Sequence, residues 1–175
     1  EDERDPGARD RRGAGAAVIV GVMHYNLRNY VLQDAANDAH DATRNMAVLY
    51  DAVVEGASME LKDGALAAVK SEAMPELANH DLVDRTASSI AGVATVFAKQ
   101  GTDYVRISTN VKKEDGSRAT GTKLAAEHPA QAALAKGAPY FGPAQLFGRD
   151  FMTGYFPVKN AAGANVGLLF IGIPM

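Results

Sequence analysis

The chain has 175 residues, of which 47% are hydrophobic and 22% charged, a balance typical of one soluble globular domain with its own core. Its net charge of -3 and its aromatic content of 7% give no basic surface for nucleic acid, so we expect no nucleic-acid partner. Because the sequence contains no Cys, disulfides, thiol nucleophiles and Cys-based zinc sites are all excluded.

The N-terminal segment differs in character from the rest. Residues 1–13 (EDERDPGARDRRG) have no apolar face, and we expect them to be disordered. Residues 14–23 are apolar but short, which fits a signal-like segment, the end of a membrane-spanning helix or the first turns of the next helix. We therefore divide the chain into a disordered or membrane-proximal leader, 1–23, and a folded domain, 24–175.

Since the sequence starts with Glu and ends in the apolar run VGLLFIGIPM, we expect it to be a part of a longer protein.

Helical spacing dominates the first part of the folded domain. Residues 24–55 contain no Pro or Gly, and their apolar side chains recur every three or four positions, which predicts one long amphipathic helix that stops at Gly56. A weaker helix is expected over residues 63–74, ending before Pro75, and a short one over residues 81–89.

Strand signals follow Gly92. A long polar connection contains a turn at Glu114-Asp115-Gly116 and a short helix that opens at His128-Pro129 and closes at Lys136-Gly137. The predicted strands are 93–98, 104–111, 140–147, 151–158 and 166–173. The fold class is therefore α+β, with the long N-terminal helix packed on a five-stranded antiparallel sheet and a helical insert between strands 2 and 3.

The second predicted strand carries the most informative pattern. Alternation places Tyr104, Arg106, Ser108 and Asn110 on one face of the strand. A guanidinium offers a fork of donors that matches a carboxylate, and hydroxyl groups complete its shell, so this face suits a small anion that is held rather than transformed. The alternative is an ordinary solvent-exposed strand Arg.

Several segments, taken in their order along the chain, resemble a known family. They are VDR at 83–85, VATVF at 93–97, YVRISTNVKKEDGSRATGT at 104–122, PYFGPAQLFGRDFMTGYFPVK at 139–159 and NVGLLFIGIP at 165–174. Together they resemble Cache domains, and more narrowly the PAS-like single-Cache type found in the extracytoplasmic part of bacterial methyl-accepting chemotaxis proteins and some sensor kinases. The sequence departs from many members at Phe151, where Tyr is common, and at Gly154 and Phe156, which replace bulkier or acidic residues.

The resemblance implies a ligand under the helical insert, on the sheet face opposite the long helix. We expect Arg106 to clamp a carboxylate, and Ser108, Tyr140 and Thr153 to donate hydrogen bonds to it. Tyr155 would add a hydroxyl group, and Arg149 would either fold over the pocket or remain an exposed turn residue. The apolar walls are expected from Phe141, Phe151 and Met152. For Tyr140 the alternative is a core residue with a satisfied hydroxyl group. Ser108, Thr153 and Tyr155 could instead be ordinary strand residues.

The resemblance also implies a function, which is the periplasmic sensor domain of a chemoreceptor that binds an acetate-, propionate- or pyruvate-like acid. We expect a membrane-anchored parent protein, a homodimer through the long helix, no cofactor and no catalysis. The alternatives are the sensor domain of a histidine kinase or cyclase, and a dimerisation module without a ligand. A small metal-dependent or acid/base enzyme is a further alternative, because Asp34, Asp38 and Asp41 share a helix face near His40, although such carboxylates usually form the solvated side of a helix.

Overall fold

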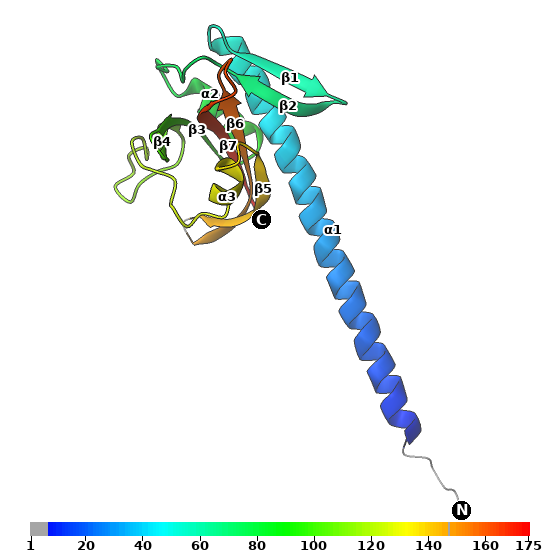
Figure 1. The fold of residues 1–175 in the computed structure, drawn as a ribbon. Coiled ribbons are helices and arrows are strands. Elements are labelled where there is room, and N and C mark those ends of the chain that lie inside the picture. Colours follow the sequence, from blue (N-terminus) through cyan, green and yellow to red (C-terminus); the bar gives the residue numbers. More distant parts are fainter. Residues whose placement is uncertain (1–6, 147) are drawn as a thin grey trace, which may run out of the picture. The chain divides into compact units, whose positions relative to one another are not determined.

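The computed structural model describes residues 7–146 and 148–175, with side chains from Ala17 onward. Helix α1 (Gly7–Val53) is followed by two short helices and seven strands (Figure 1). The chain divides into two compact units, one that ends at Asp34 and one that runs from Ala35 to Met175, and each is described by itself.

The first unit is the N-terminal part of α1. The helix begins at Gly7, so the expectation of disorder is wrong for residues 7–13, and residues 1–6 lie outside the described residues. Arg is frequent in residues 7–13 and is a strong helix former. Residues 14–23 continue the same helix, and large apolar side chains such as Ile19, Met23 and Leu27 are exposed along it. No helix within the described residues has an apolar stretch long enough to cross a membrane.

In the second unit, α1 ends at Val53, close to the predicted stop, and Gly56 follows with a φ of +75°. The buried side chains of α1 recur every three or four residues, as an amphipathic helix requires. They are Ala39, Ala42, Thr43, Met46, Ala47 and Tyr50. This stripe packs on one face of the sheet.

A β-hairpin replaces the helix that was expected over residues 63–74. Strands β1 (Ser58–Lys62) and β2 (Ala65–Lys70) pair antiparallel around Asp63 and Gly64, which have φ angles of +53° and +80°. An Asp-Gly pair suits the left-handed conformations of a tight hairpin turn, and this local signal outweighs the helix propensity of the Ala-rich segment after it.

The sheet has seven strands in the order β1-β2-β6-β7-β3-β4, with β5 also paired to β6. The remaining elements are α2 (Asp81–Ser89), β3 (Val93–Gln100), β4 (Asp103–Thr109), α3 (Gln131–Leu134), β5 (Tyr140–Leu146), β6 (Arg149–Lys159) and β7 (Asn165–Pro174). The α+β class, the helix over 81–89 and the five expected strands are confirmed, but a five-stranded, wholly antiparallel sheet is wrong. The hairpin adds two strands, and β2 pairs parallel to β6.

The two faces of the sheet are covered differently. α1 covers the face to which Gly154 belongs, because a Cβ at Gly154 would lie 2.6 Å from Oγ1 of Thr43. The connection between β4 and β5, including α3, covers the other face, where Leu134 of α3 belongs to the same buried cluster as Phe97, Tyr155 and Phe170. We call this connection, residues 110–139, the insert, and the sheet face under it the insert face.

Candidate functional site

A cavity of about 390 Å³ opens on the insert face, between the insert and the end of β5. Its volume lies in the range of small-molecule sites. Its lining combines cationic, polar and apolar side chains, and consists of Arg106, Lys112, Lys113, Ala119, Thr122, Lys123, Leu124, Ala125, His128, Gln145 and Leu146. We call it the Arg106 cavity.

Arg106 is half-buried in β4, with its guanidinium carbon 5.0 Å from the centre of the Phe97 ring. Its Nη1 donates to Oγ1 of Thr122 and to the carbonyl oxygen of Lys123, each at 3.0 Å. Its Nε is buried and has no hydrogen-bond partner. Among the described residues no Asp or Glu forms an ion pair with it. A half-buried guanidinium that lacks both a partner for its buried Nε and a counter-ion favours an external anion.

His128, which lines the cavity, and Tyr155, which does not, extend the polar part of the site. The backbone N–H of Ala130 donates to Nδ1 of His128 at 3.1 Å, which assigns the imidazole proton to Nε2. Nε2 lies 3.2 Å from Oη of Tyr155 and therefore donates to it. The hydroxyl proton of Tyr155 is then not used in this bond, although the residue is 1% exposed and does not line the cavity.

Burial sets the charges of these groups. It lowers the pKa of Arg106, although a guanidinium remains protonated in proteins. Burial, and then the nearby charge of Arg106, lower the pKa of His128, so its imidazole is neutral at pH 7. Burial also raises the pKa of Tyr155, whose side chain is 1% exposed and keeps its proton. The site therefore offers the guanidinium of Arg106, further positive charge from Lys112 and Lys113, and neutral donors, a combination that suits a small carboxylate.

Ser108 lies on the opposite face from Arg106, contrary to the prediction from alternation. Phe97 pairs with Arg106 and Val96 pairs with Ser108, which leaves Ile107 as an extra residue of β4. This β-bulge reverses the alternation beyond it. Oγ of Ser108 is 2.7 Å from Nδ1 of His80, just before α2, and the side chain is fully buried there. Ser108 is thus not a partner of Arg106.

Phe141 and Met152 do not form walls of the cavity. Phe141 pairs with Gly154, and its ring stacks on His40 of α1 at 3.7 Å between ring centres. Met152 occupies an even position of β6, as Gly154 does, and therefore also faces α1. Both residues belong to the packing of the helix on the sheet.

The structure places the other predicted residues, Tyr140, Arg149, Phe151, Thr153 and Tyr155, on the insert face. Tyr140 pairs with Tyr155 across the strands, and its ring centre is 6.4 Å from that of His128. Thr153 is fully buried, and its hydroxyl group already donates to the carbonyl oxygen of Gly142 at 2.7 Å. Phe151 is buried further along β6, and the guanidinium carbon of exposed Arg149 lies 6.0 Å from its ring centre. Among these residues Tyr155 is the one whose pKa the charge of Arg106 affects, and none of them lines the Arg106 cavity.

Sequence reasoning missed Thr122, Leu124 and His128. The segment at residues 121–124 runs antiparallel along β4, since Arg106 N–H donates to the Thr122 carbonyl and Leu124 N–H to the Tyr104 carbonyl, both at 2.9 Å. The alternation Thr-Lys-Leu after Gly121 was the available signal for this short extended segment. His128 precedes the short helix as predicted, but its ring points back to Tyr155.

On the acidic side of α1, the carboxylate of Asp41 forms an ion pair with Arg44 at 3.0 Å, so its place on the helix needs no metal ion to explain it. Within the part of the chain that the structure describes, no three His, Asp or Glu side chains lie close enough together to hold a metal ion.

Comparison with protein families gives one match, and no curated protein matches the chain. The model of the Cache 3/Cache 2 fusion domain matches residues 23–175, which is most of the chain. The match includes the second unit entire, and therefore the insert and the Arg106 cavity. The predicted Cache relationship is confirmed, and the chain belongs to the Cache 3/Cache 2 fusion family, a group of extracytoplasmic sensor domains.

Proposed function

We propose that this domain senses a small monocarboxylate, of the size of acetate, propionate or pyruvate, in the Arg106 cavity. The observation that carries the proposal is the buried Nε of Arg106, which has no partner. A carboxylate can accept hydrogen bonds from Nε and the neighbouring Nη2 in the bidentate geometry that guanidinium favours. The free hydroxyl proton of Tyr155 extends the donor set, and Leu124 and Leu146 supply apolar walls.

We also propose that the site binds its ligand without transforming it, and without a cofactor. Both ring nitrogens of His128 are already engaged, with Ala130 and Tyr155. Tyr155 retains its proton because burial raises its pKa. Because the lone pair of His128 already accepts from Ala130 and Tyr155 stays protonated, neither offers the free base near Arg106 that acid/base catalysis needs.

Isothermal titration of the 175-residue chain with acetate, propionate and pyruvate tests the proposal. We expect saturable binding of at least one acid, and a loss of about a hundredfold in affinity in Arg106→Gln, because removing one partner of a buried charged hydrogen bond costs about 3 kcal/mol. Arg149→Gln is the matched control, since it removes the same charge from an exposed position on the same face. Equal affinity of Arg106→Gln and the native chain would contradict the site. Circular dichroism checks that both variants are folded.

For the parent protein we propose a periplasmic sensor of an inner-membrane chemoreceptor, with a histidine kinase or cyclase as the alternative output. Membership of a family of extracytoplasmic sensors supports this proposal. A hybrid receptor that joins the chain to a known chemotaxis signalling domain tests it. We expect cells that carry the hybrid to respond to the acid that binds in titration, and those with Arg106→Gln not to respond.

We further propose a homodimer through α1. In the first unit, exposed apolar residues follow a heptad pattern, with steps of three and four residues, at Val20, Met23, Leu27 and Tyr30. Sedimentation of the native chain and of Leu27→Glu tests this interface, since a charge at a core heptad position should shift the protein to monomer. Val22→Glu, outside the heptad core, is the control. A native chain that is monomeric at all concentrations would contradict the proposal.

A further inference from the structure

A second cavity, of about 440 Å³, lies at a gap in the sheet and is separate from the Arg106 cavity. Along one edge of β6, residues up to Tyr155 pair with β5, and Val158 and Lys159 pair with β2. Phe156 and Pro157 lie between these two pairings. Proline has no N–H to offer to a neighbouring strand, which helps to keep the gap open. We call this cavity the β2–β6 cleft.

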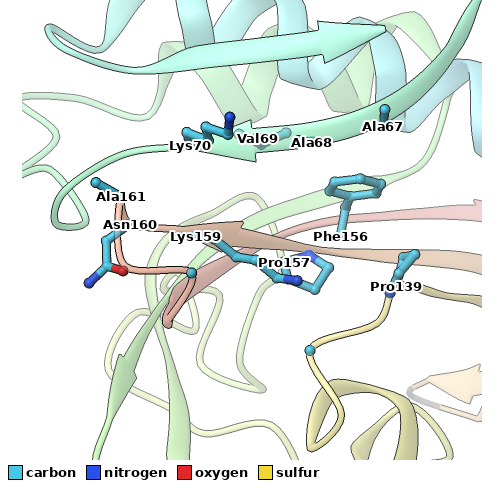
Figure 2. A pocket seen from close by; sticks show the side chains of 12 residues that line it. Ala67, Ala68, Val69, Lys70, Pro139, Phe156, Pro157, Lys159, Asn160 and Ala161 are labelled. Atoms are coloured by element: carbon cyan, nitrogen blue, oxygen red, sulfur yellow. The ribbon is translucent and has the colours of Figure 1, made fainter. Parts of the chain in front are cut away.

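The walls of the β2–β6 cleft are largely apolar. Figure 2 shows the ring of Phe156 rising from β6 toward β2, with Pro139 beside it and Ala67 across the gap. The small side chains of Ala67 and Ala68 leave room on the β2 side. The space between Ala67 and Phe156 is thus suited to a flat or short apolar group, including an aromatic ring, which packs well against Phe.

The rim of the cleft is cationic. Lys70 and Lys159 are direct partners in the parallel pairing of β2 with β6, a juxtaposition of like charges that is unfavourable without counter-ions. Lys70 is neutralised by an ion pair with Glu60. Lys159 is half-buried, and no Asp or Glu of the described residues forms an ion pair with it. Its ammonium group lies against the backbone at Gly137, where a Cβ would be 3.4 Å from Nζ.

We propose that the β2–β6 cleft binds an organic carboxylate with an apolar or aromatic body, in which the carboxylate pairs with Lys159 and the body lies between Phe156 and Ala67. An anion would give Lys159 a counter-ion, as Glu60 does for Lys70, and the apolar body would cover the exposed part of the walls. This ligand differs from that of the Arg106 cavity, because the cleft offers an extended apolar surface beside its cation. The inference is independent of the proposed function of the Arg106 cavity.

The test uses the ¹⁵N-labelled 175-residue chain, titrated with benzoate and, as an uncharged ligand of the same shape, benzamide. We expect benzoate to give saturable shifts in the amide signals of residues 67–70 and 159–161. Lys159→Gln should weaken benzoate binding by about tenfold and leave the weaker binding of benzamide unchanged. Lys136→Gln is the matched control, because it removes a nearby exposed lysine charge that does not line the cleft. Ala67→Leu should abolish binding of both ligands by filling the gap.

Two outcomes would overturn the proposal. In one, benzoate leaves the signals of residues 67–70 and 159–161 unshifted, or shifts only those around Arg106. In the other, Lys159→Gln and Lys136→Gln bind benzoate as the native chain does, so that Lys159 does not hold the carboxylate. Arg106→Gln separates the two cavities, because it should leave the shifts in the cleft intact.

Discussion

The side chains of β6 alternate between two faces of the sheet, and the two faces differ in their packing. On the helix face, Gly154 lies so close to α1 that a Cβ would meet Oγ1 of Thr43 at 2.6 Å and the Phe141 ring at 2.8 Å. On the insert face, Tyr155 lies beneath a cavity and contacts His128, while Arg106 on β4 keeps a buried Nε without a partner. The helix face is close-packed, whereas the insert face contains a polar cavity beside Arg106. This difference predicts that substitutions on the helix face change stability, and substitutions on the insert face change ligand affinity.

The largest expected effect is on the helix face, at Met46. This side chain is fully buried in the stripe of α1 that contacts the sheet. Met46→Ala should lower the free energy of unfolding by about 3 kcal/mol, because it removes buried apolar surface and leaves a cavity. Urea denaturation measures the change, and Val48→Ala, at a position that is 48% exposed on the same helix, should cost far less. A similar loss in both variants would mean that the stripe does not define the packed face.

The second prediction concerns the close approach of α1 to β6. Gly154→Ala should lower the free energy of unfolding by about 2 kcal/mol, because the new methyl group must displace Thr43 or Phe141. In a Thr43→Ala background part of this loss should be recovered, since the nearest atom is then absent. A double-mutant cycle from thermal or urea unfolding gives the coupling. Independent effects of the two substitutions would show that α1 lies further from the strand.

Sequence patterns predicted most elements of this fold, because helical spacing and strand alternation are local. The long helix, α2 and the five later strands follow from them. The β1–β2 hairpin did not, since Ala-rich residues 65–69 favour a helix in isolation and the decisive signal was the single pair Asp63-Gly64. Its parallel pairing with β6 joins residues about ninety positions apart, which no local pattern encodes.

The candidate site was predicted less completely, for two physical reasons. Alternation assigned Arg106 and Tyr155 correctly to the insert face, but it failed at Ser108 because the bulge at Ile107 shifts the register by one residue. Alternation also cannot say which strand face a ligand occupies, so Phe141 was assigned to the ligand although it stacks on His40. The contribution of His128 depends on how the insert folds back over the sheet, and its own neighbours in sequence do not reveal this.

The third prediction tests the free hydroxyl proton on the insert face. Tyr155→Phe should weaken the binding of the preferred carboxylate by about tenfold, equivalent to about 1.4 kcal/mol, because one hydrogen bond to a charged acceptor is lost. Tyr104→Phe is the control, since that hydroxyl group accepts from Asn165 at 2.8 Å and Tyr104 does not line the Arg106 cavity. Isothermal titration gives both affinities. Unchanged affinity in Tyr155→Phe would restrict the donor set to Arg106.

The smallest expected effect is a dependence of stability on pH that arises from His128. Burial and the charge of Arg106 lower its pKa in the folded state below the usual 6.5, so the unfolded chain binds a proton at a higher pH than the folded one. Stability is therefore fully present above pH 6.5 and decreases as the pH falls through that value toward the folded pKa. Asp84, whose pKa is lowered by its hydrogen bonds with Arg118, contributes in the same direction only near and below its usual pKa of 3.8.

Urea unfolding between pH 7.5 and 5 isolates the contribution of His128 from that of Asp84. His128→Gln should make the free energy of unfolding less dependent on pH in this range, whereas Asp84→Asn should leave its pH dependence unchanged. A bound carboxylate should also flatten it, because the negative charge offsets that of Arg106 and lets His128 accept a proton at a higher pH. The ligand would then bind more tightly as the pH falls toward 6, by linkage. The contrary outcome is that saturating acetate or propionate leaves the pH dependence of the free energy of unfolding of the native chain unchanged, while Arg106→Gln alters it. In that case the anion does not lie beside Arg106 and His128, and the insert face is not the sensing face.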